Sequence, residues 1–195
     1  MITQRNKATG ETRKRLVAAA LQLFVEKGVA ATTTRDIAKQ AGISEGAMYR
    51  HFESKETLAR ELFMSEFAPF SDALAQIENM PVSLIEKVDH MVRYFYQAFD
   101  ANPALWRYIV TYQSGPWSRV SDDMETPVSV VFKALRKAEE QGKIKLNDTA
   151  LQVQLVIGLV TQPAIGVVFN EIELPLSPKR GQVVEAVAAV LGIEP

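Results

Sequence analysis

Hydrophobic residues recur along most of the chain with the spacing of amphipathic α-helices. The first such face lies between residues 11 and 27, where apolar side chains recur every three or four positions. Its members are Leu16, Ala19, Ala20, Leu23 and Phe24. Gly28 follows at a position where a left-handed residue commonly ends a helix. Some stretches are rich in valine, but no alternating run is bounded by hairpin turn residues. The pattern therefore predicts an all-α protein.

Capping residues mark where the following helices begin. Thr33 with Asp36, and Ser83 with Glu86, have the three-residue spacing of a capping box. Serines or prolines mark the other starts, at Ser44, Ser54, Pro103, Pro127 and Pro178, and a Gly-Pro loop is expected near Gly115 and Pro116. The main predicted helices cover residues 11–27, 34–41, 45–52, 55–67, 84–99, 127–141, 149–170 and 178–191.

One segment, residues 149–170, contains 22 consecutive residues without a charged side chain. This length would span a bilayer, but three glutamines and Pro163 within it disfavour a membrane helix. A helix that is apolar on nearly all sides needs cover from more than one direction, so we predict that residues 149–170 and 178–191 form a two-fold dimer interface. The residues expected in this interface are Gly158, Ala164, Gly166, Val183, Val187 and Val190. The alternative is a central helix buried within one subunit.

The formal net charge of −1 conceals two pieces of opposite charge. Residues 1–60 contain 11 Lys and Arg against six Asp and Glu, which gives +5, whereas residues 61–195 sum to −6. A basic piece is attracted to polyanions, and an acidic piece is repelled by them. The charge division favours a domain over residues 9–60 that binds a polyanion and a second domain of different function over residues 61–195. The alternative is chance clustering of charges on solvated faces.

Composition restricts the enzymatic chemistry open to this chain. The absence of cysteine excludes disulfides, thiolate metal sites and cysteine nucleophiles, and with only His51 and His90 a histidine metal cluster is disfavoured. The sequence shows no glycine loop for phosphate and no serine in a nucleophile setting. We expect no catalytic residues, no metal ion, no cofactor and no enzyme activity. The first fifteen residues lack the apolar core of a signal peptide, and we expect a cytoplasmic protein.

Residues 32–52 contain the candidate binding chemistry. Two short predicted helices are joined by a tight turn at Gly42, and the small side chains of Ala38 and Ala41 permit the close, steep crossing of a helix-turn-helix. The residues left facing outward on the second helix are Glu45, Gly46, Tyr49 and Arg50. This helix is short enough to lie in the major groove of DNA. Gly46 costs about 1 kcal/mol relative to alanine inside a helix, and a closely approaching DNA molecule would account for it.

Lys55 is a second departure from helix preferences. A cation in the first turn of a helix opposes the helix dipole, at a cost of a few tenths of a kcal/mol. The same cation becomes favourable where a phosphate docks against the free N–H groups of that turn. We therefore include Lys55 among the candidate DNA contacts.

The stretch TTTRDIAKQAGISEGAMYRHFESKETL, residues 32–58, resembles the tetracycline-repressor (TetR) family of transcriptional regulators. The resemblance covers about the first sixty residues, and the remainder matches only in length and helical pattern. It implies an N-terminal three-helix DNA-binding domain, a larger helical ligand-binding and dimerisation domain, and repression that a small molecule relieves. It also implies that Thr33 or Thr34, Tyr49 and Lys55 hold phosphates. The residues nearest the bases would be Ser44, Glu45 and Arg50. Where the family often has threonine this chain has Ala47, so one possible hydroxyl contact is lost.

Aromatic residues concentrate in the middle of the second half of the chain. Most such residues belong to a core, but tyrosine hydroxyls and indole N–H groups also supply the few polar groups that a ligand pocket needs. The candidate pocket residues are His90, Met91, Tyr94, Phe95, Trp106 and Tyr112. The sequence thus predicts a regulator with three partners, which are a pseudo-palindromic double-stranded DNA operator, a small and largely apolar effector, and a second copy of the chain. A helical adaptor that binds only protein is the alternative, and no membrane partner is expected.

Overall fold

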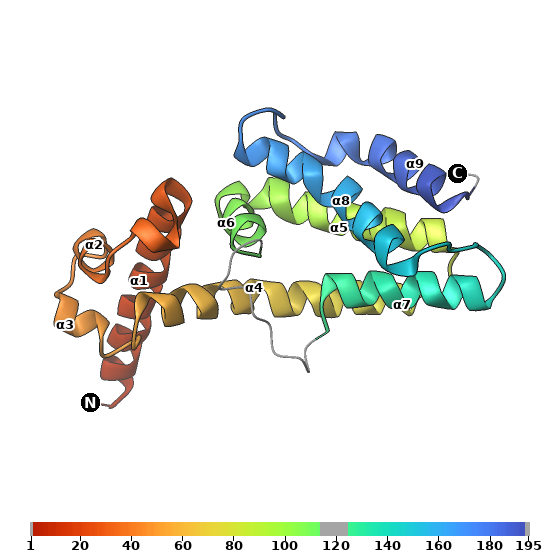
Figure 1. The fold of residues 1–195 in the computed structure, drawn as a ribbon. Helices are drawn as coiled ribbons and strands as arrows, with labels where there is room; N and C mark the ends of the chain where they lie inside the picture. Colours follow the sequence, from red (N-terminus) through yellow and green to blue (C-terminus); the bar gives the residue numbers. More distant parts are fainter. Residues whose placement is uncertain (1, 114–124, 194–195) are drawn as a thin grey trace. The chain divides into compact units, whose positions relative to one another are not determined.

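The computed structural model describes residues 2–113 and 125–193, with side chains for residues 10–112 and 125–193. All regular elements within these ranges are helices, so the prediction of an all-α protein is confirmed there (Figure 1). They are α1 (Ile2–Ala31), α2 (Thr34–Gln40), α3 (Glu45–Met48), α4 (Lys55–Glu78), α5 (Leu84–Ala101), α6 (Pro103–Gln113), α7 (Pro127–Glu140), α8 (Thr149–Val168), η1 (Ser177–Lys179, a 3₁₀ helix) and α9 (Arg180–Leu191). The predicted Gly-Pro loop lies outside the described residues.

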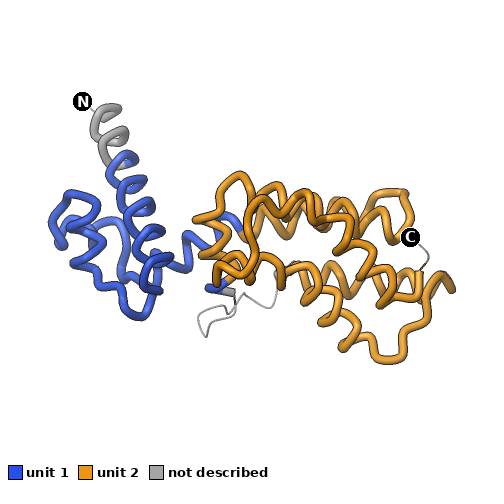
Figure 2. Tube along the Cα trace, turned by 90° about the horizontal axis from the view of Figure 1, so that it is seen from above, with its two compact units in different colours: residues 1–66, 111–119 blue, residues 67–110, 120–195 orange. Residues whose placement is uncertain are grey.

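The chain divides into two compact units (Figure 2). Unit 1 comprises Met1–Glu66 and Thr111–Arg119, and unit 2 comprises Phe67–Val110 and Val120–Pro195. Helix α4 contributes its first half to unit 1 and its second half to unit 2. The boundary predicted from charge, after residue 60, falls inside this same helix.

Unit 1 is built on the packing of α1 against α2 and of α2 against α3. Its fully or almost fully buried side chains are Leu16, Ala20, Phe24, Ile37, Ala38, Met48, Phe52 and Leu58. The predicted caps are present, because Thr33 forms a capping box with Asp36 at α2, and the Ser44 hydroxyl accepts from the Ala47 N–H at α3. Gly42 has φ +67°, which lets the chain turn sharply between the two helices. The short helix pair therefore has the predicted helix-turn-helix form.

Two predicted helix ends were wrong. Gly28 has the predicted positive φ, but its ψ of 161° makes a kink rather than a left-handed cap, and α1 resumes to end at Ala31. Helix α4 continues to Glu78 instead of ending near Phe67, and it includes Pro69. A proline inside a helix removes one hydrogen bond, yet the helix continues, and Phe67 and Phe70 on either side of Pro69 are both buried, which offsets part of this cost.

Unit 2 packs α5 against α7 and α9, and α8 against α7 and α9. Side chains buried in its core include Val92, Tyr96, Phe99, Leu135, Val156, Leu176, Val187 and Ala188. Long-range hydrogen bonds from Tyr96 and to Asp100 fix these helices. The Tyr96 hydroxyl donates to the Val160 carbonyl of α8 at 3.1 Å, and the Asp100 carboxylate of α5 accepts from the Leu176 and Ser177 N–H groups just before α9.

Part of the predicted dimer interface is instead internal to unit 2. Ala164 and Val187 are completely buried within the chain, and a Cβ on Gly166 would approach the Ile172 side chain to 2.9 Å. The small size of Ala164 and Gly166 serves packing within unit 2, and Val187 belongs to its core, so the assignment of these three residues to the interface was wrong. The exposed stripe of α8 instead runs through Leu151, Leu155, Gly158 and Gln162 to Phe169.

Helix α8 is the one helix among those described that is long and apolar enough to cross a membrane. Only 28% of its most apolar stretch is buried within the chain. A helix packed in the core of a protein meets the same criteria of length and composition, and α8 packs on α7 and α9.

Candidate nucleic-acid interface

The eight residues predicted to contact DNA all lie in unit 1, around α2, α3 and the start of α4. Thr33 and Ser44 are N-caps, and Thr34, Glu45 and Lys55 are the first residues of α2, α3 and α4. Gly46 lies within α3, Tyr49 is its C-cap, and Arg50 follows in the next turn. The helix-turn-helix thus brings residues from three helices to one part of unit 1.

Thr34, Glu45 and Tyr49 form a hydrogen-bonded group across α2 and α3. The Thr34 hydroxyl donates to Oε1 of Glu45 at 2.6 Å, and the Tyr49 hydroxyl lies 3.4 Å from the same Thr34 oxygen. Glu45 and Tyr49 are four residues apart, so they share one face of the short helix. This group holds polar side chains in fixed positions at the surface.

The hydroxyls of Thr33 and Ser44 are engaged in capping. Thr33 Oγ1 accepts from the Asp36 N–H at 3.1 Å, and Ser44 Oγ accepts from the Ala47 N–H at 3.2 Å. A hydroxyl that accepts still has its own proton to donate. Both side chains therefore keep a donor available for an external acceptor.

Tyr49, Gly46 and Arg50 present an open surface. Tyr49 is 52% exposed, Arg50 is exposed, and a Cβ on Gly46 would meet no other atom within 4 Å. No contact with a described residue therefore requires glycine at position 46. Arg50 forms no ion pair with any described residue, so its charge is available to an external anion.

Lys55 is engaged inside unit 1. Its ammonium donates to the carbonyls of Val29 (2.9 Å), Ala30 (3.0 Å) and Thr32 (2.6 Å), at the end of α1. The side chain is 19% exposed, with the Glu56 carboxylate 3.8 Å away. The last carbonyls of a helix lose the usual N–H partner four residues on, although the Val29 carbonyl also accepts from the Thr32 N–H at 3.3 Å, and a cation is favourable at a helix C-terminus. The structure therefore gives Lys55 an internal capping function that the sequence did not reveal.

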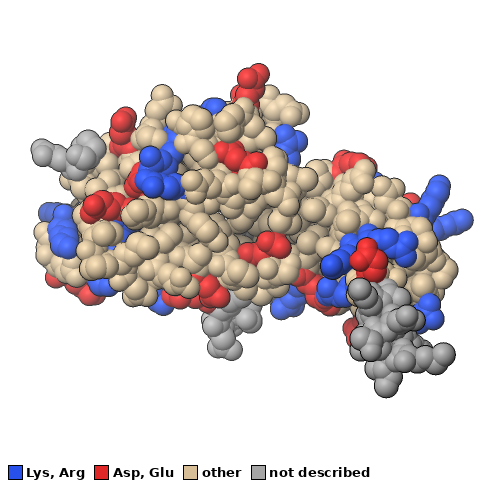
Figure 3. All heavy atoms as spheres, turned by 180° about the vertical axis from the view of Figure 1, so that it is seen from behind, with Lys and Arg blue, Asp and Glu red and all other residues tan. Residues whose placement is uncertain are grey.

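Further cations near this surface were missed from the sequence. Arg35 and Lys39 are exposed, lie four residues apart on α2, and form no ion pair with a described residue. Figure 3 shows that, on the face it presents, Lys and Arg side chains gather over unit 1. The exposed Lys and Arg residues of this unit are Arg13, Lys14, Arg15, Lys27, Arg35, Lys39, Arg50 and Arg60. The one-turn spacing of Arg35 and Lys39, next to Thr34, was the signal available in the sequence.

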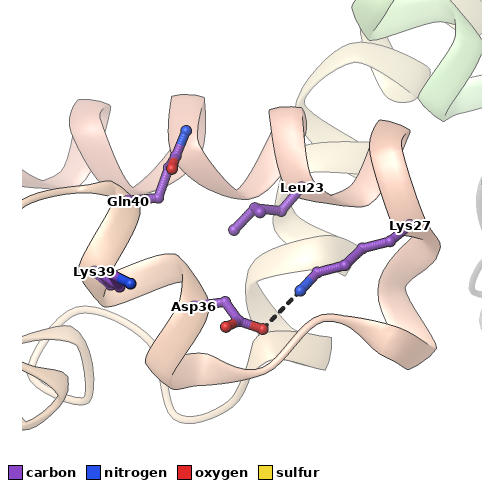
Figure 4. A pocket seen from close by; sticks show the side chains of 5 residues that line it. All are labelled: Leu23, Lys27, Asp36, Lys39 and Gln40. Carbon is purple, nitrogen blue, oxygen red and sulfur yellow. Dashed lines mark hydrogen bonds and ion pairs between the residues drawn. The ribbon is translucent and has the colours of Figure 1, made fainter.

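An open depression of about 340 Å³ lies between α1 and α2, lined by Leu23, Lys27, Asp36, Lys39 and Gln40 (Figure 4). The Lys27 ammonium and the Asp36 carboxylate meet across it at 2.7 Å. Hydrogen bonds from Lys27 and then Thr33 lower the pKa of Asp36 from 3.8 to about 2. The ion pair thus joins α1 to the capping box of α2.

Five of the six candidate pocket residues belong to unit 2, and the sixth, Tyr112, belongs to unit 1. Met91, Phe95 and Trp106 are buried in unit 2, Tyr94 is 39% exposed, and His90 is intermediate. Rings of Phe70, Phe95 and Trp106 pack against one another, with centroids 4.9 to 5.8 Å apart, and Tyr94 stacks on Phe70 at 5.5 Å. Tyr112 instead belongs to unit 1, where its ring contacts Phe63 and burial raises the pKa of its hydroxyl.

Phe70 is the member of this aromatic cluster that the sequence did not identify, because it lies beyond the predicted end of α4. Among the described residues, no group of three or more His, Asp or Glu side chains is placed to hold a metal ion.

Comparison with known proteins identifies the same region. The sequence profile of the family described as "Bacterial regulatory proteins, tetR family" matches residues 16–62. An HTH-type transcriptional repressor, KstR2 of Mycolicibacterium smegmatis, is 34% identical over 110 residues, which are 56% of this chain and 52% of that protein. The uncharacterized HTH-type transcriptional regulator YvkB of Bacillus subtilis is 25% identical over 157 residues, covering 76% of this chain and 79% of YvkB.

The likeness in fold extends over nearly the whole chain. The transcriptional regulator FadR from Bacillus subtilis, solved in complex with stearoyl-CoA, superposes with a TM-score of 0.69 at 20% identity, covering 93% of this chain and 99% of that one. A helix-turn-helix unit followed by a larger helical unit is the architecture of a DNA-binding transcriptional regulator. The matched profile and the named relatives show that residues 16–62 belong to the TetR family, and the chain as a whole shares the fold of FadR.

Proposed function

We propose that this protein is a transcriptional repressor that binds a pseudo-palindromic operator as a homodimer and is released when a small, largely apolar effector binds unit 2. The observation that carries the proposal is the exposed polar face of α3 beside three exposed cations, Arg35, Lys39 and Arg50, that form no ion pair with a described residue. A recognition helix reads base edges, whereas cations around it bind phosphates and provide most of the affinity. A cytoplasmic location accords with this function.

The exposed apolar stripe of α8 supports a homodimer. Leu151 is 55%, Leu155 44% and Phe169 67% exposed, although water disfavours such a row of large apolar side chains. A second copy of the chain that places its own α8 against this stripe would cover the exposed stripes of both copies. Two-fold symmetry would also present two α3 helices to successive turns of one DNA face, which a pseudo-palindromic site matches.

The aromatic cluster of unit 2 supports an apolar effector. Phe70, Phe95 and Trp106 are buried, and Tyr94 at the edge of the cluster is partly exposed. An apolar ligand that inserts beside Tyr94 would gain contact with these rings without an unpaired polar group. The complex of the structurally similar FadR with stearoyl-CoA is a precedent for an effector with a long apolar part.

Selection of duplexes from a random pool by the full-length protein tests this function. We expect enrichment of a pseudo-palindromic sequence, and affinity that falls with log salt at a slope of about 0.9 per phosphate contacted. Arg50→Ala should lower operator affinity and reduce selectivity at one position of each half-site, with Glu26→Ala as a control elsewhere in unit 1. Weak, salt-insensitive binding without sequence preference would overturn the proposal and favour a protein-binding adaptor.

A thermal-shift screen of small molecules, followed by a measurement of operator release, then identifies the effector.

A further inference from the structure

The Glu45 carboxylate is the feature of this surface that needs a specific explanation. Glu45 is exposed at the start of α3, and within the part of the chain that the structure describes it forms no ion pair. DNA is a polyanion, so an unpaired carboxylate on the helix that approaches it lowers the affinity. In the free protein Glu45 is stabilised by the Thr34 hydroxyl and by its place in the first turn of α3, where a carboxylate is favourable to the helix dipole. On DNA, its repulsion by the phosphates is offset where it accepts a hydrogen bond from a donor on the DNA.

Only bases offer such a donor in the major groove. The phosphates, guanine N7 and O6, and thymine O4 are acceptors, which repel a carboxylate. Donors are the amino groups of cytosine and adenine, and adenine places the acceptor N7 beside its amino group. A carboxylate, which has acceptors only, is therefore better matched to cytosine than to adenine.

We propose that Glu45 selects cytosine at one position in each operator half-site, and that Thr34 positions its carboxylate for this contact. The inference rests on the proposed DNA-binding function. In the structure the Thr34 hydroxyl donates to Oε1 of Glu45 at 2.6 Å, so Oε2 is the oxygen left to accept from the base.

This geometry gives Thr34 a different function from the one that the resemblance implies. A hydroxyl has a single proton, and that of Thr34 is donated to Glu45, so it is not available to a phosphate at the same time. The Tyr49 hydroxyl, 3.4 Å from Thr34 Oγ1, borders the same group. Thr34 and Glu45 belong to different helices, so their hydrogen bond also fixes the glutamate side chain, whose freedom would otherwise weaken its selectivity.

Base preference in the selected operator tests this proposal directly. The full-length wild type should retain cytosine at one position per half-site and bind a duplex with another base there about 10- to 100-fold more weakly. Glu45→Gln should shift the preference at that position to adenine, because an amide pairs with both N6 and N7 of adenine. Glu45→Ala should lose the preference at that position and keep it elsewhere. Glu53→Gln, which removes the charge of an exposed carboxylate outside α3, is the matched control and should leave every preference unchanged.

The positioning function of Thr34 is tested with two substitutions, one that removes the hydroxyl and one that keeps it. Thr34→Val removes the hydroxyl and should reduce discrimination at the Glu45 position by about 3- to 10-fold, whereas Thr34→Ser keeps the hydroxyl and should restore it. A purely structural function of Thr34 would instead lower affinity for all sequences alike, which contradicts the positioning role. Circular dichroism shows whether each variant is folded.

The two proposals fail differently. Selective binding by the wild type, with the same base preferred by wild type, Glu45→Gln and Glu45→Ala, would overturn the role of Glu45 and leave the proposed function intact. Failure of the folded wild type to prefer any sequence would overturn the proposed function, and the cytosine contact with it.

Discussion

At the residue scale, Lys55 has a function that its position at the edge of the DNA-binding surface conceals. Its ammonium satisfies three carbonyls at the end of α1. We therefore expect Lys55→Ala to lower the free energy of unfolding by about 1–3 kcal/mol, the usual range for hydrogen bonds with a charged partner. Urea unfolding of the full-length protein measures this change.

Lys39→Ala is the control for Lys55, because Lys39 is exposed and forms no ion pair with a described residue. It should leave stability nearly unchanged. The salt dependence of DNA binding distinguishes the capping function of Lys55 from a phosphate contact. A lost phosphate contact lowers the slope by about one, whereas a lost internal cap leaves it unchanged, as we expect. A lower slope with unaltered stability would contradict the capping role.

Asp36 gives unit 1 a defined response to acid. Its folded pKa, about 2, lies below the ordinary value of 3.8 because Lys27 and Thr33 donate hydrogen bonds to the carboxylate. A depressed folded pKa means that the carboxylate stabilises the fold above about pH 4, and that this contribution is lost as the pH falls toward 2. We expect Asp36→Asn to lower the melting temperature at pH 5, with the difference from wild type shrinking between pH 4 and pH 2. A difference that stays constant over this range would show that the charge of Asp36 is not involved.

At the element scale, α8 presents different side chains to its own chain and to the outside. Leu155 is 44% exposed on the α8 stripe, whereas Val187 of α9 is fully buried. We expect Leu155→Glu to convert a dimer into a folded monomer, because the substitution leaves a charge unpaired in the interface. Val187→Glu should instead unfold unit 2, because it places an unpaired carboxylate in the core. Sedimentation at micromolar concentration, with circular dichroism, distinguishes these outcomes.

Gln97→Glu, an exposed neutral-to-acidic change on α5, is the control for Leu155→Glu. It should leave both assembly and stability intact. A Leu155→Glu protein that still sediments as a dimer would place the interface elsewhere.

Helix starts were predictable from the sequence, because a cap is a local signal. Thr33, Ser44 and Ser83 each begin a helix as predicted, and each hydroxyl accepts from an N–H three residues later. Helix ends and faces were less predictable, since they depend on distant residues. The predicted end of α4 near Phe67 was wrong because the helix continues through Pro69 to Glu78, and the interior position of Gly166 depends on Ile172 in the following loop.

In the candidate site, too, local features were predictable from the sequence and contacts between distant residues were not. Local spacing identified the helix-turn-helix and the outward face of α3, whereas the partners of Thr34 and Lys55 lie on other helices. Periodicity describes one helix at a time, so it gives no information about which residue of a second helix supplies the partner. Tyr112 was assigned to the effector domain for the same reason, because nothing local shows that its ring meets Phe63.

At the scale of the whole molecule, the proposed function requires that two separate sites influence each other. Any effector that lowers operator affinity by a given factor must itself bind the operator-bound protein more weakly by the same factor. Helix α4 contributes residues to both units and is therefore one physical connection through which this coupling can pass. The aromatic cluster that includes Phe70 of α4 is where we expect the effector to act.

Tyr94 offers the cleanest test of this coupling, because it stacks on Phe70 at 5.5 Å yet is 39% exposed, so its truncation spares the core. We expect Tyr94→Ala to weaken effector binding by about 1–3 kcal/mol, as expected for the loss of a large apolar side chain from a contact. Operator affinity without effector should stay at the wild-type value, since Tyr94 lies outside the DNA-binding unit. Fluorescence anisotropy of labelled operator, titrated with protein and then with effector, measures both quantities. Phe95→Ala, which opens a cavity in the core, should unfold unit 2 and serves as the control for a purely structural effect. Equal loss of operator affinity with and without effector in Tyr94→Ala would contradict a separate effector site at this cluster.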